Sequence, residues 1–131
     1  MTTRRDFVIT SGAALAASKL PRANAATADA DAAVERLLAG IAEELLVDYP
    51  ESATMLGIDN GERVGLKSKL ADRSAAGQES IAKRVASRIE RLKHLDLESL
   101  GDAARVDVDV VRTAHQFALE GFKFPYGDVA C

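Results

Sequence analysis

The chain has 131 residues and a net charge of −3, which limits it to one domain at most. Four of its 17 basic and one of its 20 acidic residues precede Ala26, which leaves 13 basic and 19 acidic residues from there on. This acidic balance, without a basic patch, argues against nucleic acid and anionic membranes as partners. Abundant alanine and few aromatic residues favour helices, so we expect an all-α fold.

Residues 1–25 resemble a twin-arginine secretion signal. The residues that match its Ser/Thr-Arg-Arg-x-Phe pattern are Arg4, Arg5 and Phe7. The apolar stretch that follows, Val8–Ser18, is too short to span a bilayer, which takes about 20 residues. Ala23 and Ala25 form the small-x-small pattern of a signal peptidase site. A cytoplasmic amphipathic helix from Phe7 is the alternative, but four signal features in the right order favour export.

We therefore predict that residues 1–25 bind the export machinery and are removed, and that residues 26–131 reach the periplasm or the medium. Twin-arginine export carries folded proteins, often with a cofactor, so the signal hints at a cofactor without identifying one. The single cysteine, Cys131, excludes an internal disulfide. A lipoprotein needs a cysteine just after its signal, where this chain has Ala26, so we expect no stable membrane anchor after cleavage.

The first predicted helix covers about Ala28–Asp48. Its apolar residues recur at intervals of three and four and form one stripe: Val34, Leu37, Leu38, Ile41 and Leu45. Pro50 ends the helix, because proline pushes the residue before it out of the helical region. We expect Glu43 and Glu44 on a solvated face. Residues 57–73 contain three glycines and an asparagine, which indicates loop and turn.

Two further helices are predicted, so the fold has about three amphipathic helices. The second starts near Asp72 or Ser74, either of which can cap it. Its apolar stripe is Ile81, Val85, Ile89 and Leu92, and its solvated side is Lys83, Arg84, Arg88 and Arg91. The third follows Asp102 and stops near Gly121. Its expected inward residues are Val106, Val110, Ala114, Phe117 and Ala118. Residues 106–110 also alternate with period two, like a strand, but the helical period continues beyond them.

No set of residues matches a catalytic or metal-binding pattern. The two histidines, His94 and His115, are 21 residues apart, whereas zinc sites recruit histidines three or four apart. We expect His94 to stabilise a helix C-terminus and His115 to lie on the surface or between domains. A pair between His115 and Asp107 is the alternative. Asp107 and Asp109 point to different sides of a helix and make a poor acid–base pair. We expect no catalytic, cofactor-binding or metal-binding residue in this chain.

Three segments in order resemble one large bacterial protein family. Asp48–Gly57 is similar to its Pro-x-x-Ala-Thr-x-x-Gly element, and the matching residues are Pro50, Ala53, Thr54 and Gly57. Leu70–Ser74 resembles its Leu-x-Asp-x-Ser segment, and Leu95–Val111 resembles its helix with a leucine followed by Arg-x-Asp. The family is catalogued as domain of unknown function 885. The resemblance covers roughly residues 30–125, nearly the whole chain after the signal.

The resemblance implies a predominantly helical, often exported protein of several hundred residues that looks like a zinc metallopeptidase. The family's presumed metal motif, of the His-Glu-x-x-Pro-Gly-His type, lies far toward the C-terminus. No His-Glu pair exists in this sequence, so no metal ligand or catalytic residue is carried over. Zinc is therefore implied for the full-length family and not for this chain. The matched Pro50, Ala53, Thr54 and Gly57 are interpreted as packing and turn residues.

The leading hypothesis is that residues 26–131 are the N-terminal part of a longer exported, metallopeptidase-like protein and pack on the rest of that chain. The alternative is a small, self-contained periplasmic binding or adaptor protein with an unknown protein partner. The first should expose an apolar face, whereas the second needs polar outer faces throughout. Six apolar residues off the main stripes favour the first: Leu46, Val47, Met55, Leu56, Phe122 and Phe124.

Overall fold

The structure, a computed structural model, describes residues 21–124, with side chains from residue 25 onward. Across this range it contains helices and no strand, which confirms the all-α prediction. The elements in chain order are α1 (Pro21–Asp48), α2 (Pro50–Met55), the 3-10 helix η1 (Gly61–Ser68), α3 (Ala75–Lys93), the 3-10 helix η2 (Leu97–Ser99) and α4 (Asp102–Gly121). The three predicted helices correspond to α1, α3 and α4, and the prediction missed the shorter elements.

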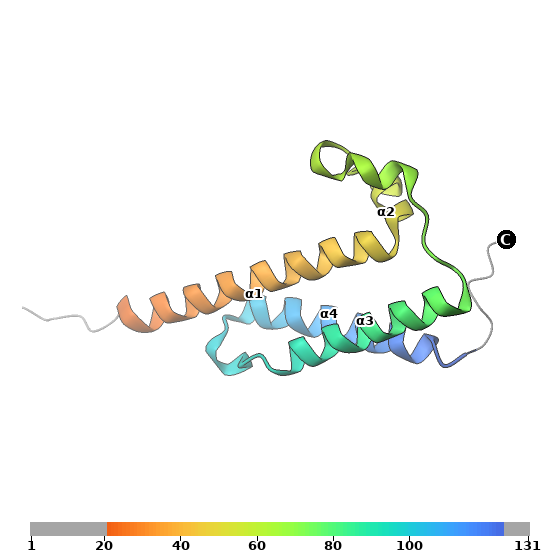
Figure 1. The fold of residues 1–131 in the computed structure, drawn as a ribbon. Helices are drawn as coiled ribbons and strands as arrows, with labels where there is room; N and C mark the ends of the chain where they lie inside the picture. The colour runs from red at the N-terminus through yellow and green to blue at the C-terminus, as the bar shows by residue number, and fades with distance from the viewer. Residues whose placement is uncertain (1–20, 125–131) are drawn as a thin grey trace, which may run out of the picture.

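The three long helices form one bundle (Figure 1). α3 and α4 make an antiparallel hairpin joined through η2, and α1 packs against this hairpin. α2 and η1 contact each other and form a small lobe beyond the C-terminal end of α1. The backbone N–H of Gly101, just before α4, donates to Oδ1 of Asp31 at 2.9 Å and so ties the start of α4 to α1.

The helix boundaries follow local capping rules. Ser74 caps α3, as predicted, because its side-chain oxygen accepts a 3.1 Å hydrogen bond from the backbone N–H of Gly77. Helix α1 ends at Asp48, and Pro50 opens α2 at a position where its missing N–H costs nothing. Helix α4 ends at Gly121, also as predicted.

The prediction that residues 57–73 are only loop and turn is wrong in part, because η1 occupies the middle of that segment. Two polar contacts hold this region against the helices before it. Arg63 of η1 pairs with Glu43 of α1, and the backbone N–H of Ala71 donates to the Glu51 carboxylate at 3.0 Å. Glycine has a low α-helix propensity, and this segment forms a short 3-10 helix instead of an α-helix.

The core lies between α1 and the hairpin. One buried cluster joins α1, η2 and α4 to the end of α3, and its members are Val34, Ile41, Leu92, Leu100 and Val108. A second lies farther along α3, and it contains Ile81, Val85 and Ile89 with Tyr49, Leu119 and Phe122 packed against them. The predicted stripe of α3 is therefore fully confirmed, because all four of its residues are buried.

The predicted inward face of α4 is wrong. Val106 is 59%, Val110 61% and Phe117 73% exposed, and Ala114 and Ala118 are exposed as well. The residues of α4 and its end that face the bundle are Ala104, Val108, Val111, His115, Leu119 and Phe122.

Helix α4 carries two apolar stripes at helical spacing, on opposite sides, and only one of them can face the hairpin partner. The stripe through Val108 continues through Leu119 to Phe122. These residues pack in the same clusters as the buried stripe of α3, from Leu92 to Ile81. The stripe through Val110 ends at Phe117 and is left outside. Packing along the full hairpin buries more apolar surface, and this decides the orientation.

Candidate functional site

Within residues 25–124, helix α4 has more exposed large hydrophobic residues than any other helix, and they are Val106, Val110 and Phe117. Over this outer face of α4 lies a wide-open, shallow depression of about 490 Å³ whose lining residues all belong to α4: Val106, Asp109, Val110, Thr113, Ala114 and Phe117. The small side chain of Ala114 lies one turn beyond Val110 and leaves a hollow beside the larger Phe117. We call the strip formed by Ala103 and the five uncharged lining residues the outer seam.

The spacing of the outer seam is that of a coiled-coil contact. Its apolar and small residues alternate at intervals of three and four, and they are Ala103, Val106, Val110, Thr113 and Phe117. This span of 15 residues is about 21 Å long at 1.5 Å per residue. Such a strip fits a second helix laid along it, because side chains of one helix can enter the hollows of the other.

Acidic residues border the outer seam on both sides. Asp102 and Asp109 fall along one border, Asp107 lies on the other, and Glu120 follows Phe117 by three residues at the end of the strip itself. Arg112 pairs with Asp109 at 2.5 Å from the side of the helix that faces away from the seam. Lys123 pairs in the same manner with Glu120 at 2.6 Å. Arg105 also lies 3.9 Å from Asp102, so Asp107 is the border carboxylate without an ion pair among the described residues. Asp102, Asp107 and Asp109 nevertheless stay exposed to any helix that lies along the seam.

The buried centre of the molecule contains an ion-pair network that the sequence analysis missed. Arg88 of α3 and Asp48 of α1 are both buried, and Nη2 of Arg88 lies 2.7 Å from Oδ2 of Asp48. Neither of these two atoms has an aligned hydrogen bond, so the contact is a close charge pair rather than a well-formed hydrogen bond. Arg84 reaches the other oxygen of Asp48 at 2.6 Å.

Glu44 joins the same network one turn earlier on α1. It accepts hydrogen bonds from Arg91 at 2.7 and 2.9 Å and from Nε of Arg88 at 2.8 Å. Hydrogen bonds from Arg91 and then Arg88 lower the pKa of Glu44 to about 2. Burial alone would lower the pKa of Arg88, but its hydrogen bond to Glu44 and its close charge pair with Asp48 raise that pKa above the ordinary value. The network is a structural bridge between α1 and α3.

One expectation about this network was wrong: Arg88 was expected on the solvated side of its helix and is buried. Glu44 was expected on a solvated face, and its side chain is 42% exposed while it is also bound by two arginines. Arginines spaced by four and three on α3 match carboxylates spaced by four on α1. That complementary spacing is the signal in the sequence that points to the bridge.

The two histidines lie in different environments. His94 lies at the C-terminus of α3, the position that was expected, and is exposed, while its stabilising role stays a prediction. His115 is buried, so the expectation of a surface or interdomain histidine is wrong. Its Nδ1 lies 2.7 Å from the carbonyl oxygen of Val111, and its Nε2 has no hydrogen-bond partner within the described residues. The alternative pair is not formed either, because Asp107 is exposed and lies two turns away on α4.

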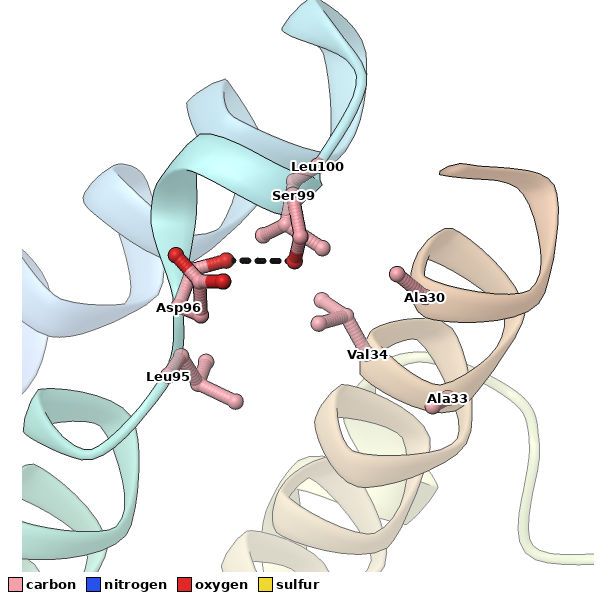
Figure 2. A pocket seen from close by; sticks show the side chains of 7 residues that line it. All are labelled: Ala30, Ala33, Val34, Leu95, Asp96, Ser99 and Leu100. Carbon is pink, nitrogen blue, oxygen red and sulfur yellow. Dashed lines mark hydrogen bonds between the residues drawn. The ribbon is translucent and has the colours of Figure 1, made fainter. Parts of the chain in front are cut away.

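A second, smaller hollow of about 210 Å³ lies where η2 meets the N-terminal half of α1 (Figure 2). Its walls are mainly apolar, and its seven lining residues are Ala30, Ala33, Val34, Leu95, Asp96, Ser99 and Leu100. The polar groups near it are already used within the turn: Ser99 donates to the Asp96 carbonyl at 2.8 Å, and Asp96 accepts from the backbone N–H of Glu98. This arrangement is a helix connection rather than a reactive centre.

The residues that carry the family resemblance have packing and turn roles here. Ala53 is fully buried, and its carbonyl accepts a 2.9 Å hydrogen bond from the N–H of Ile58. Gly57 has a φ of 67°, the left-handed conformation that favours glycine. Thr54 donates to the buried Asp59 at 2.8 Å and closes the same turn. The sequence interpretation of Pro50, Ala53 and Gly57 is confirmed.

Several predicted residues are not tested by this geometry. Arg4, Arg5, Phe7 and Cys131 lie outside the described residues. Ala23 and Ala25 lie in the first turns of α1, and their role as a cleavage site stays a prediction.

The described residues do not gather a metal site. Nowhere among residues 25–124 do three or more His, Cys, Asp or Glu side chains converge as metal ligands, so the zinc that the resemblance implies has no ligand set in this part of the chain. No helix within the described range is long and apolar enough to cross a membrane. Comparison of the chain with family models, with curated proteins and with solved structures finds no match.

Proposed function

We propose that this chain is the non-catalytic N-terminal helical segment of an exported protein that resembles the metallopeptidase-like family named above. In this proposal the chain folds as a bundle and docks through the outer seam of α4 onto the remainder of a longer helical protein, in the periplasm or outside the cell. Zinc and the catalytic residues would belong to that remainder. The twin-arginine pattern of Arg4 and Arg5 supports export.

The observation that carries the docking part of this proposal is the exposure of the outer seam. Val106, Val110 and Phe117 are each more than half exposed while Val108, on the same helix, is completely buried. An exposed apolar strip bordered by polar residues marks a contact surface. Three further apolar residues, at the end of α1 and in the adjoining lobe, are exposed as well: Val47, Met55 and Leu56. They support the proposal that another part of a longer protein covers this surface. Of the other off-stripe residues, Phe124 is exposed, whereas Leu46 is buried and Phe122 packs against α3.

The experiment that tests the proposal is to read the gene beyond codon 131 in this organism and its relatives. A reading frame that continues into a His-Glu motif supports the proposal. A native stop codon at this position in every relative contradicts it.

A second candidate function, a self-contained periplasmic adaptor, is favoured by one observation. The interior between α1, α3 and α4 is closed without a further element, because Ile41, Leu92 and Val108 are buried within the described residues. Thermal unfolding separates the two candidates. A docking segment should unfold over a shallow transition and associate, whereas an adaptor should unfold sharply and reversibly as a monomer.

A further inference from the structure

We propose that the outer seam binds an amphipathic helix whose own apolar strip is bordered by lysine and arginine, and that this helix is not a second copy of α4. The inference rests on the proposed docking role of the outer seam and adds the chemistry of the element that covers it. It assigns that element to the remainder of the longer protein.

The shape of the seam indicates a helix as the occupant. Its contact residues alternate at intervals of three and four over about 21 Å, which is the repeat that brings two helices into register. The hollow beside Ala114, with Val110 and Phe117 around it, can receive one apolar side chain from a facing helix. An extended peptide would instead need free backbone donors and acceptors, and within α4 these groups are bonded along the helix.

The charges along the borders decide which helix. Asp102 and Asp109 on one border and Asp107 on the other are exposed carboxylates. Arg105 and Arg112 pair with Asp102 and Asp109 from the side away from the seam, and Asp107 has no ion pair among the described residues. Residues at these positions meet the border residues of the facing helix in a coiled-coil contact. Basic residues on the partner would be attracted there, and acidic ones would be repelled.

A second copy of α4 is disfavoured by the same charges. In a parallel pair, Asp102 and Asp109 of one copy would face the border that contains Asp107 of the other. In an antiparallel pair, Asp102 and Asp109 would face each other, and Asp107 would face its own copy. Both arrangements place carboxylates opposite carboxylates. An anionic membrane surface is disfavoured for the same reason.

The test uses the full 131-residue chain and two synthetic peptides of about three heptads with the same leucine strip. One peptide has lysine at its border positions and the other has glutamate, and each contains one tryptophan. The chain itself has no tryptophan, so peptide fluorescence reports binding without background. We expect the lysine-bordered peptide to bind about ten-fold more tightly or better, and the preference to shrink as salt screens the charges.

Three variants locate the binding. Val110→Asp places a charge in the centre of the seam and should abolish binding of both peptides. The double variant Asp107→Lys with Asp109→Lys should reverse the preference in favour of the glutamate-bordered peptide. The matched control is Glu35→Lys with Asp29→Lys, which makes the same charge change at two exposed positions of α1 and should leave the preference unchanged. Circular dichroism verifies that each variant keeps its helical content.

The outcomes separate this inference from the proposed docking role. Equal binding of both peptides that is lost in Val110→Asp overturns the charge selection and leaves the docking surface intact. Binding of neither peptide overturns both. A dimer in sedimentation equilibrium that Val110→Asp disrupts identifies a second copy as the occupant and overturns the inference as well.

Discussion

Arg88 of α3 and Asp48 of α1 face each other in the interior of the bundle, with Nη2 of Arg88 2.7 Å from Oδ2 of Asp48 and both side chains withdrawn from water. Loss of either residue leaves the other buried with a single partner, Arg84 for Asp48 or Glu44 for Arg88. The pair therefore favours the observed packing of α1 on α3, because that packing places the two buried charges opposite each other. The first prediction follows from this pair.

Replacing Arg88 by methionine should lower the free energy of unfolding by about 3 kcal/mol, because Asp48 stays buried with only Arg84 as its partner. Replacing both residues, Arg88→Met with Asp48→Leu, should recover most of that loss, since no buried charge remains. Urea unfolding followed by circular dichroism measures both. Lys83→Met, at an exposed site on the same helix, serves as the control and should change little. A double variant no more stable than Arg88→Met would contradict this account.

The second prediction concerns pH and Glu44. Its folded-state pKa of about 2 lies below the ordinary value of 4.5 because Arg91 and Arg88 donate to it. A depressed carboxyl pKa contributes stability that is fully present above about pH 4.5 and is lost as the pH falls toward 2. Glu44 is 42% exposed, so solvent screening limits the contribution to the order of 1 kcal/mol. Glu44→Gln should therefore lose less stability than the unaltered chain over this interval. Urea midpoints measured across the interval test it, and parallel pH profiles would refute it.

The third prediction tests the orientation of α4 with one substitution at two neighbouring sites. Val108→Ala removes buried methyl groups and leaves a cavity, so it should cost about 2 kcal/mol of unfolding free energy. Val110→Ala, two residues along the same helix, removes the same atoms from the exposed face and should stay within about 0.5 kcal/mol. Denaturant midpoints compare the two directly. Equal costs, or a larger cost at Val110, would place the other stripe of α4 in the core.

The fourth prediction uses two glycines of the helices. A Cβ at Gly77, in the first turn of α3, would lie 2.3 Å from the backbone oxygen of Asp72, so Gly77→Ala should destabilise the chain and disturb the cap by Ser74. A Cβ at Gly40 of α1 meets nothing within 4 Å, and Gly40→Ala should stabilise the chain by up to about 1 kcal/mol. Thermal midpoints of the two variants should move in opposite directions. A common direction would argue against one of the two environments.

The fifth prediction concerns export. Changing Arg4 and Arg5 together to lysine should keep the precursor in the cytoplasm, because the export receptor reads the fork-shaped guanidinium pair and not its charge alone. Cell fractionation and immunoblotting measure the distribution of the variant. A matched control changes Lys19 and Arg22, basic residues outside the motif, to arginine and lysine and should be exported normally. Unchanged accumulation of the Arg4, Arg5 variant outside the cytoplasm would contradict the twin-arginine assignment.

Local physical chemistry in the sequence determined a large part of the fold. The stripe of α3, its cap at Ser74, the end of α4 at Gly121 and the left-handed turn at Gly57 were all predicted correctly. Each of these depends on residues within a few turns of one another, through helical spacing, a capping hydroxyl or the freedom of glycine. Such interactions are written in the sequence itself and do not require knowledge of what packs where.

The tertiary structure decided what local spacing left open. Helix α4 has two apolar stripes, and only the length of its match with α3 selects Val108 for the core and leaves Val110 and Phe117 outside. Arg88 is buried because Asp48, 40 positions earlier in the chain, supplies its counter-charge from another helix. The proposed function rests on the outer seam. The outer seam is exposed because the opposite stripe of α4 is the one buried in the bundle. A periodic pattern specifies that a helix has a face, and contacts between distant segments choose which face is buried.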